Sequence, residues 1–146
     1  MKGESDFVLT IEHGVRLLQN LGAKITSQRV AIMKSLEGRC DHPSAEQLFI
    51  ELRSDHPAIS IATIYSTAQL LASASFIKIL TIDEKKVYFD SDTSPHGHFM
   101  CKKCRLIVNV PVDFEQVDRQ ARIPEIAVLS DSQVFFYGFC THCVNG

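Results

Sequence analysis

The sequence predicts an α+β protein made of two consecutive parts, the first helical and the second rich in strands. Three observations support this prediction. Apolar residues recur at helical spacing as far as residue 75, β-forming residues follow from residue 76, and two Cys-x-x-Cys pairs bracket residues 101–143. We expect a first domain over residues 1–90, a hinge over 91–95 and a second domain over 96–146.

The composition is that of an ordinary globular protein. Charged residues make up 22% of the 146 residues and the net charge is −2, so charge gives no indication of nucleic acid as a partner. No apolar stretch approaches the roughly 18–20 residues needed to cross a bilayer, and residues 1–6 carry no signal-peptide pattern. We therefore expect a cytoplasmic protein with no membrane contact, whose paired cysteines bind metal.

The first part contains four expected helices. The first runs from about Val8 to Gly22, and the fourth runs from Ile61 to about Ala74 with one apolar face. The expected N-terminal caps of the second, third and fourth helices are Thr26 or Ser27, Ser44 and Ser60.

Two runs of β-forming residues follow the helices, at 76–82 and 86–89, and they predict a hairpin. Helices followed by a two-stranded ribbon is the element order of a winged helix, in which one helix enters the major groove of DNA. The fourth helix is the candidate reader, and Arg29 is a candidate phosphate contact. The polar side chains expected to contact DNA from the fourth helix are Ser60, Thr63, Tyr65, Ser66 and Thr67. The alternative is a helix bundle whose polar face is only solvated.

The second part is expected to contain strands at His98–Cys101, Leu106–Val110 and Val128–Phe139, the last with a break, and a helix around Phe114–Arg122. A unit of about 50 residues is small for a core of its own. It needs a covalent or metal staple, a partner chain, or both. The apolar run over residues 132–139 offers a surface for a second copy, so we expect a homodimer.

Four of the five cysteines form two Cys-x-x-Cys pairs. Cys101 and Cys104, together with Cys140 and Cys143, can supply the four thiolates of a tetrahedral structural Zn²⁺ site. A thiol–disulfide pair and an iron–sulfur cluster are the rival interpretations. Cys40 stands alone, and we expect it to be a small buried apolar residue.

Histidines and a carboxylate near the predicted hinge suggest a second metal site. His96 and His98 project to the same side of an extended segment, Asp90 precedes the hinge, and His42 lies between the second and third helices. A nitrogen and oxygen ligand set suits Fe²⁺, Mn²⁺, Zn²⁺ or Ni²⁺. Exposed loop histidines without a metal are the alternative.

Taken together, several segments resemble the ferric uptake regulator superfamily over nearly the whole chain. They are residues 25–29 (ITSQR), 41–45 (DHPSA), 60–65 (SIATIY), 89–90 (FD), 96–104 (HGHFMCKKC) and 137–143 (YGFCTHC). The resemblance implies an N-terminal winged helix-turn-helix domain and a small C-terminal α/β dimerisation domain with the four-cysteine zinc site. It also implies a hinge metal that permits binding of a homodimer to a palindromic operator in double-stranded DNA.

Within the superfamily the chain is most similar to the peroxide regulator (PerR) subgroup. The resemblance makes His42, Asp90, His96 and His98 ligands of a regulatory Fe²⁺ or Mn²⁺. The fifth ligand position falls at Asn109, where the subgroup has Asp and iron-responsive members have Glu. An amide oxygen can coordinate but brings no charge, so we expect weaker binding of a hard cation.

Pro95 and Gly97 stand where iron-responsive members have donor side chains of an additional site, which favours the peroxide subgroup. There, iron reacts with peroxide, oxidises a ligand histidine, His42 or His96, and thereby releases DNA. This scheme implies a regulator and not an enzyme. The alternatives are an iron-responsive repressor of metal uptake genes and a metal hydrolase, although the chain has no His-Glu-x-x-His motif.

Overall fold

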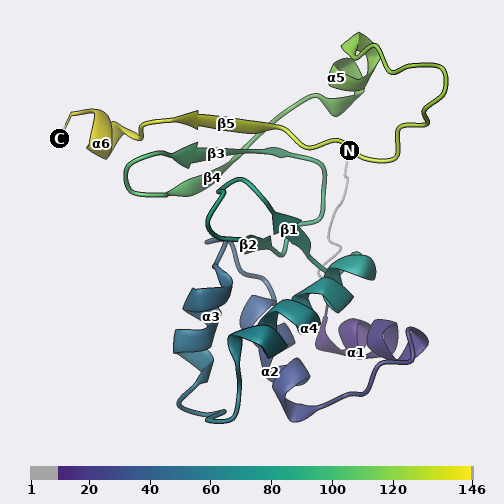
Figure 1. The fold of residues 1–146 in the computed structure, drawn as a ribbon, viewed down its shortest axis with the longest axis vertical. Coiled ribbons are helices and arrows are strands. Elements are labelled where there is room, and N and C mark those ends of the chain that lie inside the picture. Colours follow the sequence, from purple (N-terminus) through teal and green to yellow (C-terminus); the bar gives the residue numbers. More distant parts are fainter. Residues whose placement is uncertain (1–9, 146) are drawn as a thin grey trace. The chain divides into compact units, whose positions relative to one another are not determined.

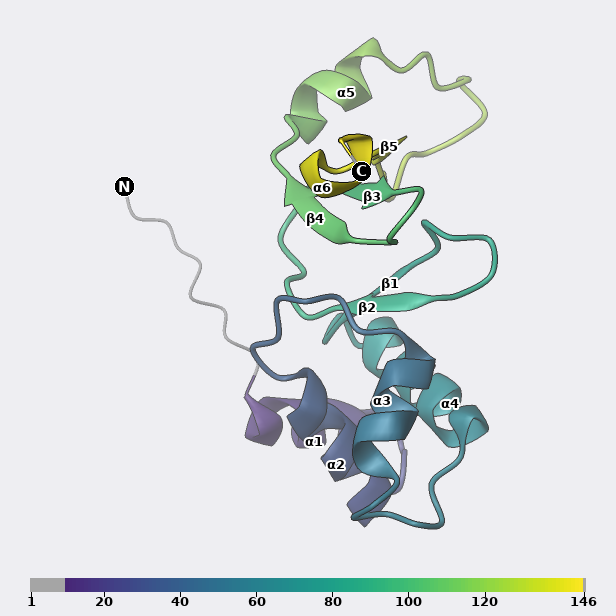
Figure 2. The same cartoon turned by 90° about the vertical axis from the view of Figure 1, so that its left-hand side faces the viewer.

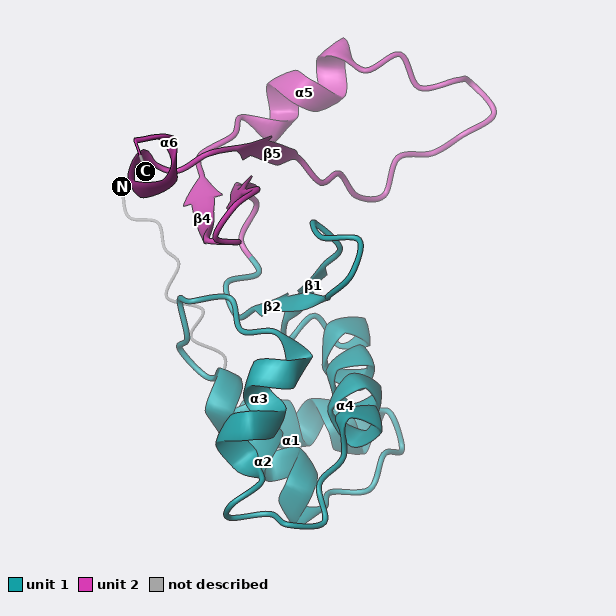
Figure 3. Ribbon diagram, turned by 60° about the vertical axis from the view of Figure 1, so that its left-hand side comes forward, with its two compact units in different colours: residues 1–93 teal, residues 94–146 magenta. Residues whose placement is uncertain are grey.

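The computed structural model describes residues 10–145 and divides the chain into two compact units, one ending at Thr93 and the other beginning at Ser94 (Figure 3). Val8, expected in the first helix, lies outside the described residues. The hinge role of residues 91–95 stays a prediction. Among residues 10–145, no helix has both the length and the apolar character required to cross a membrane.

Four helices make up most of the first unit: α1 (Ile11–Asn20), α2 (Ser27–Leu36), α3 (Ala45–Leu52) and α4 (Ile61–Ser73) (Figure 1). Each begins after a residue whose hydroxyl accepts the backbone N–H three positions later, which satisfies a donor that the helix leaves unpaired. These caps are Thr10, Thr26, Ser44 and Ser60. The structure confirms the caps expected at Thr26, Ser44 and Ser60.

The core of the first unit lies between these helices. Fully buried side chains from all four of them, among them Leu18, Met33, Leu48 and Leu71, pack into one cluster. α4 contacts α1, α2 and α3, so its apolar face is covered while Ser60 and Ser66 stay exposed. This burial fixes which face of α4 is left free for a partner.

The hairpin is shorter than expected. β1 (Lys78–Leu80) pairs antiparallel with β2 (Tyr88–Asp90), but Phe76 and Ile77 belong to the helical core. Ser75 adopts a left-handed conformation with φ 61°, and the N–H of Phe76 donates to Leu71 O at 2.8 Å. The end of α4 therefore folds Phe76 back onto the helices and delays the first strand.

A three-stranded sheet forms the second unit, in the order β4-β3-β5 (Figure 2). Its centre is β3 (Gly97–Cys101), which pairs antiparallel with β4 (Ile107–Val110) and parallel with β5 (Phe135–Gly138). Two helices complete the unit, α5 (Phe114–Gln120) and α6 (Thr141–Val144). The sequence patterns did not predict α6.

The strand expected from Val128 begins only at Phe135. Polar side chains bind the chain ahead of it: Ser132 Oγ donates to Asp118 Oδ1 at 2.7 Å, and Ser132 N–H donates to Asp131 Oδ1 at 2.9 Å. Such local bonds offer the backbone an alternative to a strand ladder. Val128 therefore remains 95% exposed.

We expect Gly14→Ala to destabilise the first unit, although alanine favours a helix more than glycine does. A Cβ at position 14 would lie 2.8 Å from both Met33 Sδ and Phe76 Cε2 in the closed core. We predict a loss of about 1–3 kcal/mol in the free energy of unfolding, measured by urea denaturation. Gln19→Ala, on the exposed side of the same helix, is the control. A Gly14→Ala variant as stable as the unmodified protein would contradict this prediction, because the core would then accommodate the added methyl group without a loss of stability.

Candidate functional sites

The four paired cysteines converge in the second unit. Cys101 ends β3, Cys104 lies in the following turn, and Cys140 and Cys143 flank and enter α6. The parallel register pairs Cys101 with Gly138, which delivers the second Cys-x-x-Cys pair to the first. All four sulfur atoms lie within 4.8 Å of one another, and Cys104 Sγ is 3.8 Å from Cys140 Sγ. A tetrahedral Zn–S₄ centre has sulfur–sulfur edges of about 3.8 Å, so the donor set and spacing fit Zn²⁺.

The thiols of this cluster differ strongly in acidity. Backbone N–H groups of Cys104 and Cys140 point at the Cys101 sulfur, the latter at 3.4 Å, and lower the pKa of that thiol to about 6. The hydrogen bond from Cys143 to the Cys140 sulfur, together with burial, raises the pKa of Cys143 to about 12. The cluster alone accommodates one thiolate readily but not four, since their charges repel. A divalent cation supplies the missing compensation.

In the first unit, His42 and Asp90 form a buried pair. Their side chains are each 3% exposed, and His42 Nε2 lies 3.6 Å from Asp90 Oδ2. The other carboxylate oxygen, Asp90 Oδ1, accepts the N–H of Asp92 at 2.9 Å, so the orientation of the carboxylate is fixed. Two ligands at about 2.1 Å from one metal ion lie about 3–3.4 Å apart, which is close to the observed separation.

Strand β2 and the segment between α2 and α3 hold this pair in place. Phe89 N–H donates to Pro43 O at 2.9 Å, and Ser44 forms an isolated antiparallel bridge with Tyr88. Residues 42–44 and 88–90 are thereby bonded side by side. The sequence predicted both residues as ligands but did not predict this pairing, because it depends on a contact between segments far apart in the chain.

In the second unit, His96 and His98 form another pair of donors. Their Nε2 atoms lie 3.1 Å apart, and His98 is 2% exposed. His96 Nδ1 lies 2.7 Å from Ser94 O. Since a carbonyl can only accept, Nδ1 carries the proton and the Nε2 of neutral His96 keeps its lone pair for a ligand.

Asn109 lies directly opposite His98 in the antiparallel register of β4 with β3. Side chains of opposed residues project from the same face of a sheet, so the Asn109 amide lies on the same face as the His98 ring. Asn109 is exposed. Its role as a ligand stays a prediction.

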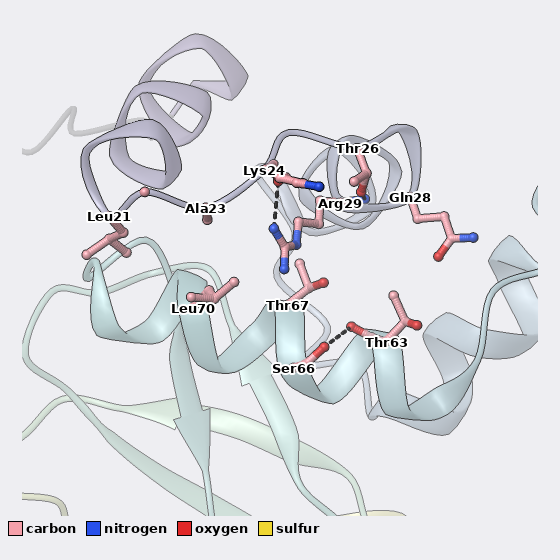
Figure 4. Close-up of a pocket in the computed structure, with 11 residues that line it drawn as sticks. Leu21, Ala23, Lys24, Thr26, Gln28, Arg29, Thr63, Ser66, Thr67 and Leu70 are labelled. Atoms are coloured by element: carbon pink, nitrogen blue, oxygen red, sulfur yellow. Dashed lines mark hydrogen bonds between the residues drawn. The ribbon is translucent and has the colours of Figure 1, made fainter.

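A recess of about 590 Å³ lies between α4 and the segment that leads into α2 (Figure 4). Arg29 lines it from α2 and donates from Nη1 to Lys24 O at 2.6 Å, which fixes the position of the guanidinium. Thr63 and Ser66 line it from α4. The recess thus combines two cationic residues with hydroxyl groups, a lining that suits a phosphate oxygen.

Of the side chains expected to contact DNA, one is buried, one caps its own helix and one is only partly exposed. Thr67 is fully buried, so a direct DNA contact by its hydroxyl does not agree with the structure. Ser60 caps α4. Tyr65 is only partly exposed, and burial, with the nearby Glu46, raises the pKa of its hydroxyl. Helical periodicity predicted which side of α4 carries these residues, but it could not predict how deeply each side chain is buried.

Cys40 is exposed, which corrects the expectation of a buried residue. In the same segment, between α2 and α3, the neighbouring Arg39 is hydrogen-bonded to Asp41 and Glu51, whereas the Cys40 thiol lies in solvent. The sequence did not identify Arg39 as a functional residue, because its partners Asp41 and Glu51 lie at spacings that form no recognised motif. Its hydrogen bonds hold the pKa of both carboxyl groups below the usual range.

Comparison with known proteins gives a consistent result. The model of the ferric uptake regulator family matches residues 20–133. The peroxide-responsive repressor PerR of Staphylococcus aureus (strain USA300) is 30% identical over 134 residues, which covers 91% of this chain and 90% of the relative.

Two solved structures share the fold. The ferric uptake regulator of Helicobacter pylori, described as having three functional metal binding sites, superposes with a TM-score of 0.74 at 23% identity and covers 94% of this chain and 95% of its own. The Francisella tularensis regulator, solved with iron, gives a TM-score of 0.69 at 28% identity and covers 84% and 96% of the respective chains.

We expect the zinc cysteines of the metal-stripped protein to ionise in widely separated steps. Cys101 should ionise near pH 6, since donated N–H bonds favour its thiolate, whereas Cys143 should stay protonated up to about pH 12. The depressed Cys101 pKa stabilises the fold above the usual thiol pKa, and this contribution is lost as the pH falls through 6. Thiolate absorbance against pH should show the early step, and Cys101→Ser should remove it. A Cys40→Ser control should keep it.

Proposed function

The chain belongs to the ferric uptake regulator family of metal-dependent transcriptional regulators, and we therefore propose that it is a repressor that binds double-stranded DNA as a homodimer. The observation that supports a metal-responsive role best is the buried His42–Asp90 pair. A neutral histidine and a carboxylate placed together out of solvent form a nitrogen and oxygen donor pair, and a bound cation would compensate for the buried negative charge. The finer proposals below concern which metals bind and what they sense.

We propose that Zn²⁺ at Cys101, Cys104, Cys140 and Cys143 is structural. Four sulfur ligands fill a tetrahedral shell, so no position is open for a substrate. The ion would tie β3 to the segment after β5. This closure compensates for the few buried apolar side chains in the described part of the second unit.

We further propose a regulatory Fe²⁺ or Mn²⁺ held by His42 and Asp90 from the first unit and by His96 and His98 from the second. Each pair has a donor separation that suits one ion, 3.6 Å and 3.1 Å respectively. Asn109, in register with His98, would complete the set through its amide oxygen. Occupancy would then fix the hinge, residues 91–95, and with it the geometry for binding DNA.

Peroxide is the proposed signal. Bound Fe²⁺ would supply the chemistry that activates the O–O bond of hydrogen peroxide. In the net reaction, peroxide would oxidise the imidazole ring of His42 or His96 by two electrons: one oxygen would be inserted at a ring C–H and the other would leave as water, so the site would lose a neutral donor. His96 is held for this role by Ser94 O, which keeps its Nε2 unprotonated. The similarity to PerR supports this sensing mode, in which each molecule would react once with peroxide and act as a sensor and not as an enzyme.

The DNA contact is proposed for the exposed face of α4 and the adjoining recess. Thr63, Ser66 and the partly exposed Tyr65 would face the major groove, and Arg29 would reach a phosphate. A two-fold homodimer presents two such helices, so the operator should be palindromic. The wing would be the β1–β2 hairpin.

Peroxide should add one oxygen to His42 or His96 in the Fe²⁺-loaded protein and leave the Mn²⁺-loaded protein unmodified, because Fe²⁺ activates peroxide much more readily than Mn²⁺ does. The test loads protein anaerobically, adds one equivalent of hydrogen peroxide, and reads intact and peptide masses beside operator binding. Loss of DNA binding should accompany oxidation. If neither sample is oxidised, peroxide sensing is wrong, and a reversible iron-responsive co-repressor site becomes the better account.

Asn109→Asp should strengthen binding of Mn²⁺, since it adds a second carboxylate beside Asp90. We expect an increase of roughly tenfold in affinity, which equals about 1.4 kcal/mol. Val108→Asp is the matched control, because it adds the same charge one residue away on the opposite face of β4. Equal effects from both variants would mean that charge acts at long range and that position 109 is not a ligand.

A further inference from the structure

Arg39, in the segment between α2 and α3, binds two carboxylates at once. Its Nε and Nη2 donate to the two oxygens of Asp41 at 2.7 and 3.1 Å. Its Nη1 and Nη2 donate to the two oxygens of Glu51 at 2.7 and 2.8 Å. The Arg39 side chain is only 19% exposed. Two bidentate contacts to one planar guanidinium define its position in the plane, which a lysine could not do.

The same guanidinium connects the elements around it. Nη1 also donates to Ser35 O in the last turn of α2, at 3.2 Å. Gln47 Nε2 donates to Glu51 Oε2 at 3.1 Å, which orients that carboxylate from within α3. Arg39 therefore holds α2, α3 and Asp41 in one hydrogen-bonded group.

Asp41 directly precedes His42, whose backbone is left-handed with φ 51°. L-residues avoid this region, so the surrounding bonds must impose it on His42. On the C-terminal side, Pro43 O accepts Phe89 N–H at 2.9 Å. On the N-terminal side, the bond from Arg39 to Asp41 fixes the chain. Hydrogen bonds thus hold the chain on both sides of His42, and Arg39 donates those on the N-terminal side.

We infer that Arg39 is a positioning residue for His42: through Asp41 it holds the imidazole where the regulatory metal binds, and metal affinity depends on it. This inference rests on the proposed function. A purely structural role for Arg39 would lower the stability of the first unit and leave the metal affinity of the folded protein unchanged. Residues that orient a ligand from outside the ligand shell commonly change metal affinity 10- to 100-fold when they are replaced.

The test measures Mn²⁺ binding to the zinc-loaded full-length protein by the electron paramagnetic resonance signal of free Mn²⁺. Arg39→Met and Asp41→Asn should weaken Mn²⁺ binding by about tenfold or more, with zinc content unchanged. Asp41→Glu, which keeps a carboxylate for Arg39, should retain most of the affinity. Arg119→Met is the matched control, because it breaks an exposed ion pair with Glu115 in the second unit.

All variants are compared well below their thermal unfolding midpoints, so that a folded population is measured. A lower midpoint with unchanged Mn²⁺ affinity in both Arg39→Met and Asp41→Asn would overturn the inference and leave Arg39 a structural residue. If the unmodified protein binds zinc but no further Mn²⁺ or Fe²⁺, the proposed function fails and the inference fails with it. The two failures are therefore distinguishable.

Discussion

The second unit depends on the meeting of four sulfur atoms within 4.8 Å of one another. In its described part, the buried apolar side chains are Met100, Cys101 and Ile107, whereas the core cluster of the first unit spans four helices. So small an apolar core offsets only part of the entropy of ordering about 50 residues. The cysteine cluster closes the unit at both ends, and the cation that it accommodates contributes binding energy to folding. Ile126 and Val128, almost fully exposed, leave apolar surface that a second copy would cover in the proposed dimer.

Local chemistry made much of this fold predictable. A hydroxyl before an apolar helical pattern fixes a helix start, and Thr26, Ser44 and Ser60 each cap the helix expected of them. The Cys-x-x-Cys spacing likewise predicted a cluster that the structure assembles. The start of β5 was not predictable in this way, because Asp118 binds Ser132 across a separation that no local pattern shows. Thr67 is buried because α4 packs against three other helices, and helical periodicity alone could not predict this burial.

The donors proposed for the regulatory site illustrate the difference between composition and geometry. The residue types alone identified the candidate ligands, which are His42, Asp90, His96 and His98. The structure adds the hydrogen bonds that orient the side chains of each pair. The N–H of Asp92 restrains one oxygen of Asp90, and Ser94 O fixes the tautomer of His96. Such outer contacts decide whether a donor is ready for a metal before the metal arrives. With Asn109 neutral, the proposed site carries a single carboxylate, so its affinity for a hard cation relies more on this preorganisation.

The parallel pairing of β3 with β5 has a consequence for the order of assembly during synthesis. The helices of the first unit close over short stretches of chain, whereas Cys101 meets Gly138 only after the whole intervening segment has been made. Contacts between distant residues carry a larger loop-closure entropy and form later. A nascent chain would therefore complete its helical unit first and its sulfur cluster last. In the proposed zinc-bound homodimer, the second unit would therefore be the last part of a newly made molecule to reach its final form.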